Sequence, residues 1–215
     1  SMKLKFQWLL LIMFLWPTSV SAQSYFGGFV GFNSSKLSGD APQKAKYKSS
    51  IGINVGAFLD LRLNDDLLLS FQPSYTQEGT KISYDVSGQS EAVDSIKIGL
   101  DYFSLPLFLK IQGANQRFYA LSGFETGFLL SSSTTINDEK EDLEVEISDI
   151  NVAMHFGAGI HIPVGSSRMF VELRYSQGLI NLTDEPLSQN IIPRVKTSGF
   201  KVLVGYEFPL NKEKI

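Results

Sequence analysis

The sequence contains no cysteine, only two histidines, and no long apolar run beyond its N-terminal segment. Without cysteine the chain can form neither a disulfide framework nor a lipid-modified cysteine at a mature N-terminus. Both tryptophans, Trp8 and Trp16, lie in the first segment, so only Phe and Tyr remain to serve at a membrane interface. After Trp16 no apolar run approaches the roughly 20 residues of a transmembrane helix. Any membrane insertion must therefore use a closed β-barrel, the other structure that satisfies all its backbone groups in lipid.

Residues 2–22 have the pattern of a secretory signal peptide, and Ser1 before Met2 is interpreted as a cloning remnant. Lys3 and Lys5 form the basic part, residues 6–16 the apolar part, and Val20-Ser21-Ala22 supplies small residues at the cleavage position. The apolar part is too short for a membrane anchor. We expect cleavage after Ala22, which leaves residues 23–215 as a single barrel domain.

The charge balance excludes one class of partner. Loss of Lys3 and Lys5 takes the basic residues from 19 to 17, against 22 acidic residues. An acidic chain without a basic stripe does not indicate a nucleic-acid partner.

Alternation of apolar and polar residues predicts the secondary structure. The clearest segment runs from Ile51 to Leu61, and such a period belongs to a β-strand between two different solvents. Its length matches the 9–11 tilted residues that cross a bilayer. We predict eight strands, with ten as the alternative count, at residues 25–33, 51–61, 67–76, 96–111, 117–130, 151–162, 169–179 and 199–208.

Two irregularities are expected within these strands. Pro73 removes a ladder donor and indicates a bulge or irregular pairing. The apolar parity changes between Leu100 and Phe103, which predicts a second bulge near Asp101 or Tyr102.

The connections alternate in length. They are tight after the second, fourth and sixth strands, whereas polar stretches at 78–95, 131–149 and 181–196 are expected to be long loops. Outer-membrane barrels have short periplasmic turns and longer extracellular loops, so both chain ends are expected on the periplasmic side.

The placement of charges decides which face is wet. Every charged residue within the spans lies on the polar parity, together with most of the glycines. A soluble calyx, the competing interpretation, would place large apolar residues inside. The predicted fold is therefore an all-β, transmembrane, antiparallel up-and-down β-barrel whose lumen is filled by side chains. The predicted polar network of the lumen is structural and comprises Asp60, Lys110, Glu125, His155, Glu172, Arg174, Lys201 and Glu207.

Three segments carry a family resemblance. They are Phe29 to Asn33 followed by Leu37-Ser38-Gly39, the Leu-Pro-Leu element within Tyr102 to Lys110, and Gly157 to Pro163 running into Glu172 to Ser176. These segments resemble the PorT-like outer-membrane β-barrel family of Bacteroidetes. The resemblance implies an outer-membrane location in a Gram-negative bacterium. The family's namesake is associated with a protein secretion system, and most members have no assigned activity. Ser104 stands where members often carry an acidic residue.

No catalytic, cofactor or metal site is predicted. His155 and His161 lie six residues apart on one strand, roughly 20 Å, and cannot share one ion. Neither histidine has a serine two residues away on its face, so no triad is indicated. We therefore expect a non-enzymatic, monomeric barrel that acts through extracellular loops in surface interaction or envelope and secretion assembly. Its expected partners are outer-membrane lipid, lipopolysaccharide and an envelope protein. A lipid-modifying enzyme and a narrow channel are the alternatives.

Overall fold

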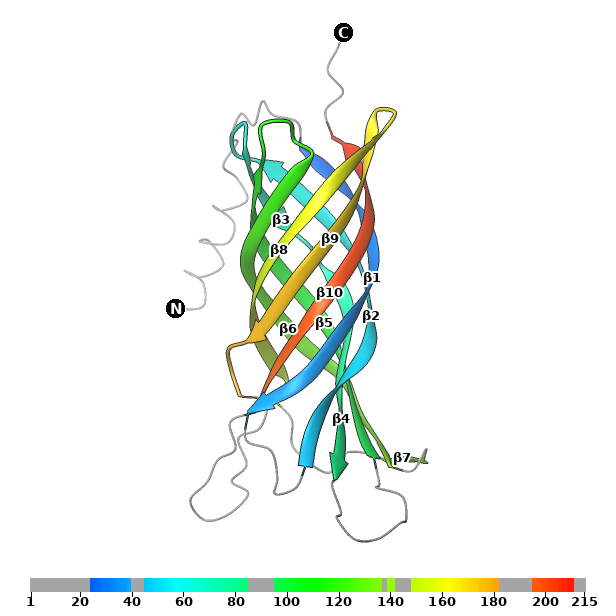
Figure 1. Ribbon diagram of the computed structural model, residues 1–215. Coiled ribbons are helices and arrows are strands. Elements are labelled where there is room, and N and C mark those ends of the chain that lie inside the picture. Colours follow the sequence, from blue (N-terminus) through cyan, green and yellow to red (C-terminus); the bar gives the residue numbers. More distant parts are fainter. Residues whose placement is uncertain are drawn as a thin grey trace, which may run out of the picture.

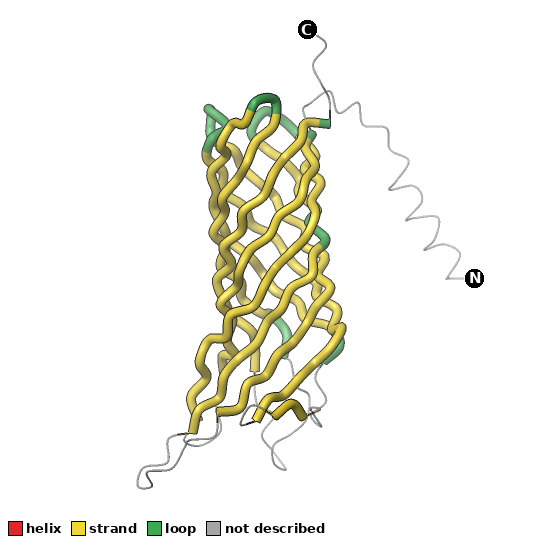
Figure 2. The backbone as a smooth tube through the Cα atoms, turned by 90° about the vertical axis from the view of Figure 1, so that its right-hand side faces the viewer, coloured by secondary structure: helices red, strands yellow, loops and turns green. Residues whose placement is uncertain are grey.

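The computed structural model describes residues 24–39, 45–84, 95–136, 139–141, 148–181 and 195–210. The predicted signal peptide lies outside these residues. The described chain folds into one antiparallel sheet that closes on itself as a tall, narrow cylinder of tilted strands (Figures 1 and 2). No helix within it is long and apolar enough to cross a membrane. The strands are β1 (Tyr25–Gly39), β2 (Ala45–Arg62), β3 (Leu67–Phe71), β4 (Ser74–Tyr84), β5 (Ser95–Gln112), β6 (Phe118–Ile136), β7 (Glu139–Glu141), β8 (Ile150–Val164), β9 (Ser167–Gly178) and β10 (Val195–Pro209).

The ring has eight positions, which confirms the predicted count. β3 and β4 share one position, since both pair with β2 on one side and with β5 on the other. β7 is a short strand that pairs with the end of β6. From β6 the ring continues through β8, β9 and β10, and β10 pairs with β1 along the whole of β1. The closed ring leaves no free edge through this part of the wall.

Pro73 separates β3 from β4, as expected of a residue without a ladder donor. The gap is bridged because Ala57 N donates to Pro73 O at 3.0 Å and Gln72 N donates to Pro106 O at 3.1 Å. Pro106 lies in the adjacent strand β5, so the two missing donors fall at one level of the wall.

The second irregularity lies where it was predicted but on a different strand. Asp101 pairs with Ser131 and Tyr102 pairs with Leu129, so the additional residue belongs to β6. β5 keeps one parity throughout, and Leu100 is buried inside the barrel beside Tyr102. β6 changes parity instead, since Glu125 and Thr134 are both buried. A bulge in β5 itself would have turned Leu100 outward, but β6 absorbs the shift and Leu100 stays inside.

The strands are longer than predicted. β4 continues to Tyr84 and β6 to Ile136, into stretches that were expected to be loops. The ladder persists there because each strand still has a paired neighbour, with Ile96 opposite both Ile82 and Ile136. At this end β1 and β2 part: their pairing stops at Ser35 and Ser50, while β1 stays paired with β10 and β2 with β4. Figure 1 shows β2, β4, β5 and β7 running on past the cylinder. We call this part, residues 45–49, 79–84, 95–99 and 131–136 with β7, the strand extension.

The two ends of the barrel differ. Short turns join β2 to β3, β5 to β6 and β8 to β9, and the described chain begins and ends beside them, where Leu210 N donates to Ser24 O at 2.8 Å. The strand extension lies at the opposite end. The asymmetry agrees with the predicted arrangement of short turns and chain termini.

The outer face is apolar and the inner face is polar. Outward positions expose large apolar side chains on every strand position of the ring, including Val30, Ile53, Leu107, Phe124, Phe156, Leu173 and Val202. No charged residue occupies an outward position between Phe26 and Ser34, Ile51 and Leu61, Phe103 and Ile111, or Phe200 and Phe208. A band of this height with no charge is the lipid-facing girdle of a membrane barrel, since a central Lys or Arg there costs about 2–4 kcal/mol.

The lumen contains more aromatic residues than the sequence suggested. A buried cluster of Phe29, Phe58, Phe108, Tyr119, Leu121, Phe170 and Leu203 fills part of it. The inward glycines make room for these rings and not chiefly for charged side chains. A Cβ would approach a ring within 3.0 Å at each of five pairs, Gly27 and Phe58, Gly56 and Phe29, Gly123 and Phe108, Gly159 and Tyr119, and Gly205 and Phe170.

Gly205→Ala should destabilise the barrel by about 1–3 kcal/mol, the usual cost of overpacking. The new methyl would lie 2.3 Å from the Phe170 ring and 2.7 Å from the backbone oxygen of Gly28. Gly28→Ala on the adjacent strand is the matched control, because its nearest neighbour is at 3.5 Å. Urea unfolding in lipid vesicles measures both. Equal stability of the two variants would contradict this account of the glycines.

Candidate functional site: the lumen

The eight residues predicted for the lumen network all point into the barrel and are nearly fully buried, with at most 6% exposure. They come from β2, β5, β6, β8, β9 and β10. The structure gathers them into four clusters along the barrel axis, each with at least one cation and one anion.

The first cluster joins Asp60 on β2 to Lys110 on β5. Lys110 Nζ donates to Asp60 Oδ2 at 2.7 Å, and Ser70 Oγ donates to the other carboxylate oxygen. The ammonium group also lies 5.3–5.8 Å from the ring centroids of Phe58, Tyr119 and Phe170. A desolvated cation gains from both contacts, so this pair is held by a carboxylate on one side and by π-faces on the others.

The second cluster centres on Glu125 of β6. Lys201 Nζ donates to its two carboxylate oxygens at 3.3 and 3.2 Å, and Ser104 Oγ donates to it at 3.1 Å. His155 Nε2 lies 3.3 Å from Glu125, and Glu78 lies 3.9 Å from Lys201. The cluster therefore connects strands β4, β5, β6, β8 and β10 across the interior.

This cluster contains a serine, a histidine and a carboxylate, but not in the order of a catalytic triad. A triad places the histidine between the nucleophile and the carboxylate. Here Ser104 donates to Glu125 itself, and Ser104 and His155 are 1% and 0% exposed. The serine is therefore a hydrogen-bond donor to a buried carboxylate, out of reach of lipid.

The third cluster lies on β9, where Arg174 Nε donates to Glu172. Arg174 Nη2 also donates to Gln72 at 2.6 Å, and Tyr119 OH donates to Glu172 at 2.6 Å. The guanidinium carbon lies 4.6 Å from the Phe108 ring centroid. The ion pair is thus enclosed by the aromatic cluster.

The fourth cluster closes the short-turn end. Glu207 is fully buried and lies 2.7 Å from Arg168 and 3.3 Å from His161. Arg168 stacks on Tyr25 at 3.8 Å, and His161 stacks on Tyr119 at 4.5 Å. A pocket of about 440 Å³ opens at this mouth, and its inner residues His161 and Arg168 both contact Glu207. The cluster therefore forms the floor of the mouth.

The sequence predicted one network without specific partners, and the structure shows which of its residues meet. Glu172 does contact Arg174, and Glu125 does contact Lys201, but Lys110 pairs with Asp60 in a cluster of its own. Cross-barrel partners depend on the stagger between strands, which parity does not specify.

Several lumen residues were missed. Glu78 was assigned to a loop and Arg168 to a turn. The polar parity of Ser70, Gln72, Ser74 and Thr76 continues through Glu78 to Thr80, and this signal would have found Glu78. The inward parity of Phe170, Glu172 and Arg174 likewise runs back to Arg168, the second residue of β9, and would have placed it on the inner face.

Groups of opposite charge meet inside the wall. Asp60, Glu78, Glu125, Glu172 and Glu207 face Lys110, Arg168, Arg174 and Lys201 together with two histidines. Unpaired ions would be very costly in so narrow an interior. Among the described residues no group of three His, Cys, Asp or Glu side chains has the placement of a metal site.

A closed ring of eight strands, an apolar outer girdle and an ion-paired lumen define the class as a transmembrane β-barrel. The chain belongs to the outer membrane protein beta-barrel domain family, whose model matches residues 21–184. It is therefore a protein of the bacterial outer membrane.

The chain is also similar to solved structures of other bacterial proteins. The attachment invasion locus protein Ail of Yersinia pestis is 18% identical, with 87% of this chain and 100% of that chain covered and a TM-score of 0.43. Neisserial surface protein A is 14% identical, with 85% and 97% covered and a TM-score of 0.45. The outer membrane protease OmpT of Escherichia coli is 9% identical, with 89% and 100% covered and a TM-score of 0.42. No curated protein sequence matches the chain.

Lys110→Met should destabilise the barrel by about 3–5 kcal/mol, because it leaves Asp60 buried without its cation. The double variant Lys110→Met with Asp60→Asn should recover most of that loss. Urea unfolding of the single and double variants gives the coupling between the two residues. If the double variant were less stable than Lys110→Met alone, the ion pair would not be the source of the loss.

Proposed function

We propose that the protein is a non-conducting, non-enzymatic surface protein whose working part is the extracellular strand extension and the connections it carries. The proposal rests above all on the filled lumen. Orientation follows the rule for outer-membrane barrels, in which short turns face the periplasm.

The lumen supports a plug and not a pore. Side chains of every ring strand meet across the interior, and the largest of the fully buried ones include Tyr102, Phe108, Lys110, Phe170 and Lys201. An eight-stranded ring has room for little beyond its own side chains. A conducting path would require all four ion-paired clusters to separate.

The lumen at the end of the strand extension is also occupied. Asn54 donates to Thr76 at 2.8 Å and Asn151 donates to Thr197 at 3.3 Å. Where β2 bulges between Ser49 and Asn54, the side chain of Asn33 donates to the freed Gln77 oxygen at 2.6 Å. Side chains therefore replace the ladder there and brace the base of the strand extension.

The strand extension supports a role outside the membrane. Lipid needs only about 9–11 residues of each strand, whereas β2, β5 and β6 have 18, 18 and 19. The surplus presents a hydrogen-bonded sheet beyond the girdle. A sheet holds a binding surface more firmly than separate loops do.

A catalytic role has less support. The buried Ser104, Glu125 and His155 lack the order of a triad, as described above. Their burial also separates them from lipid substrates.

The resemblance to PorT-like barrels supports a narrower proposal, assembly with an envelope or secretion partner. Deletion of the gene should then lower the amounts of a defined set of proteins in the culture medium, measured by quantitative proteomics. An unchanged secreted proteome would remove the secretion role and leave the surface role standing.

Replacement of residues 85–94 and 142–147, which follow β4 and β7 of the strand extension, by short Gly-Ser linkers should abolish cross-linking to an external or envelope partner in intact cells. The barrel itself should still fold, because its clusters are untouched. The readout is the set of proteins that co-purify with the tagged barrel after cross-linking.

The matched control replaces the periplasmic turn residues Asn115 and Gln116 by Gly and Ser. It should leave the cross-linked set unchanged. Loss of the same partners in this control, or their retention in the loop variant, would contradict the proposal.

A further inference from the structure

Beyond the girdle, at the end that carries the strand extension, the outer wall changes from apolar to basic. On the outward positions of β1, β2, β4 and β5 beyond Ser34, Ile51, Tyr75 and Phe103, the described charged side chains are four lysines and one acid, Asp101. The lysines are Lys36, Lys48, Lys81 and Lys97. A local excess of one sign on one face attracts ligands of the opposite charge.

Three of these lysines occupy one row across the sheet. Lys48 pairs directly with Lys81, and Lys81 pairs directly with Lys97. Opposed positions on neighbouring strands lie about 4.5–5.5 Å apart at Cβ, and like charges there are destabilising. None of the three forms an ion pair with a residue that the structure describes. The row therefore has a built-in repulsion that an external anion would relieve.

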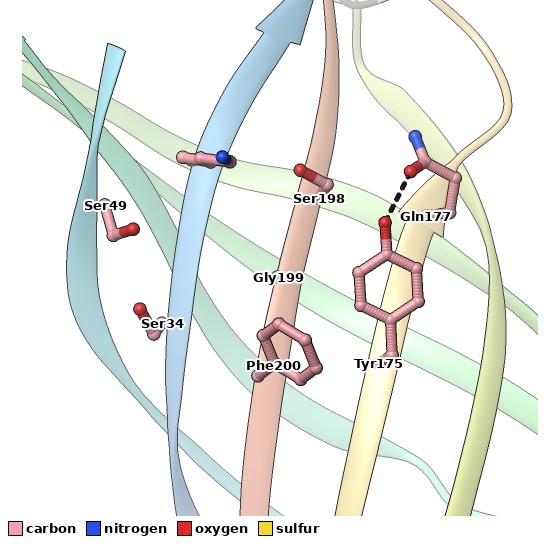
Figure 3. Close-up of a pocket in the computed structure, with 8 residues that line it drawn as sticks. Ser34, Ser49, Tyr175, Gln177, Ser198, Gly199 and Phe200 are labelled. Carbon is pink, nitrogen blue, oxygen red and sulfur yellow. Dashed lines mark hydrogen bonds between the residues drawn. The ribbon is translucent and has the colours of Figure 1, made fainter.

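A groove lies beside this row, at the rim of the girdle nearest the strand extension. It measures about 370 Å³ and crosses β9, β10, β1 and β2. Figure 3 shows Tyr175 and Phe200 side by side on neighbouring strands, with Gln177 and Ser198 beyond them. Their ring centroids are 5.1 Å apart, and Tyr175 OH donates to Gln177 at 2.8 Å. The aromatic pair thus marks the apolar end of the groove.

The polar end of the groove has hydroxyl, amide and ammonium groups. Ser34, Ser49 and Ser198 line it with Gln177, and Lys36 provides a cation. Lys36 has no ion pair among the described residues, and no acidic residue lines the groove. Hydroxyl and amide groups suit the hydroxyls of a sugar, and an ammonium group suits a phosphate.

We propose that this groove and the adjoining lysine row bind the phosphorylated sugar headgroup of an outer-leaflet glycolipid. The position of the groove identifies the occupant. From Tyr175 and Phe200 toward the short-turn end, the wall faces acyl chains, so the groove lies at the level of the lipid headgroups. Lys36 binds one phosphate, and the row of Lys48, Lys81 and Lys97 binds further phosphate or acid groups of the same layer. The lipid site is independent of any protein partner of the strand extension.

The probe is lipid A, a phosphorylated and acylated glucosamine disaccharide. It is incorporated at a fixed fraction into nanodiscs of zwitterionic phosphatidylcholine that hold the full-length barrel. Each lysine near a charged surface contributes enough to change binding about fivefold. The variant Lys36→Gln with Lys48→Gln should therefore lower lipid A retention roughly 25-fold, as measured by native mass spectrometry.

Arg117→Gln is the control, because it removes one exposed cation at the opposite, short-turn end. It should leave retention unchanged. Lipid A without its phosphates should bind the unaltered protein as weakly as lipid A binds the double variant, which separates phosphate recognition from acyl contact.

Equal retention by the unaltered protein and the double variant would overturn the site. A loss of about fivefold in Arg117→Gln, the loss expected for one lysine of the site, would overturn it too, since the effect would then follow net charge alone. Folding of each variant is checked by its heat-modifiable mobility in gels. Because the measurement contains no protein partner, its failure would leave the proposed surface role untouched.

Discussion

Closure of the backbone ladder between β1 and β10 is the constraint on which the rest of the structure depends. In hydrocarbon every unpaired backbone group costs several kcal/mol, so a sheet must meet itself. Here β1 and β10 pair from Tyr25 to Gly39 without a break. Closure with eight positions fixes a narrow interior, and the narrow interior then decides which residues can face it.

Two features of the inner wall fit side chains into this narrow interior. Glycines on one strand lie under aromatic rings from the next, which fills volume without a second side chain. Charged residues meet opposite charges across the barrel, as Asp60 meets Lys110 and Glu125 meets Lys201. Because opposite charges meet inside the barrel among the described residues, the proposed function lies at the surfaces outside the membrane. There the ladder no longer has to close, and β1 separates from β2 beyond Ser35.

Much of the fold could be predicted from the sequence because two solvents impose a period of two. The strands, their number, their inner and outer faces and the short turns all follow from that period. Its limits appear at particular residues. Leu100 was misplaced because the parity change seen along β5 is absorbed by β6, and only pairing shows which strand carries a bulge. Glu78 was missed because the strand extension has polar residues on both faces. Such a stretch resembles a loop in sequence, although the backbone ladder continues. The partner of Lys110 depends on the stagger between neighbouring strands, and the residue pattern of one strand does not specify that stagger.

If the lumen is closed by its own side chains, as proposed, the purified protein should conduct no ions. Single-channel recording in planar bilayers measures this. We expect no discrete openings over a wide range of voltage. Discrete openings whose conductance changes on removal of Lys201 or Arg174 would contradict a closed lumen, because an ion path would then pass through the charged clusters.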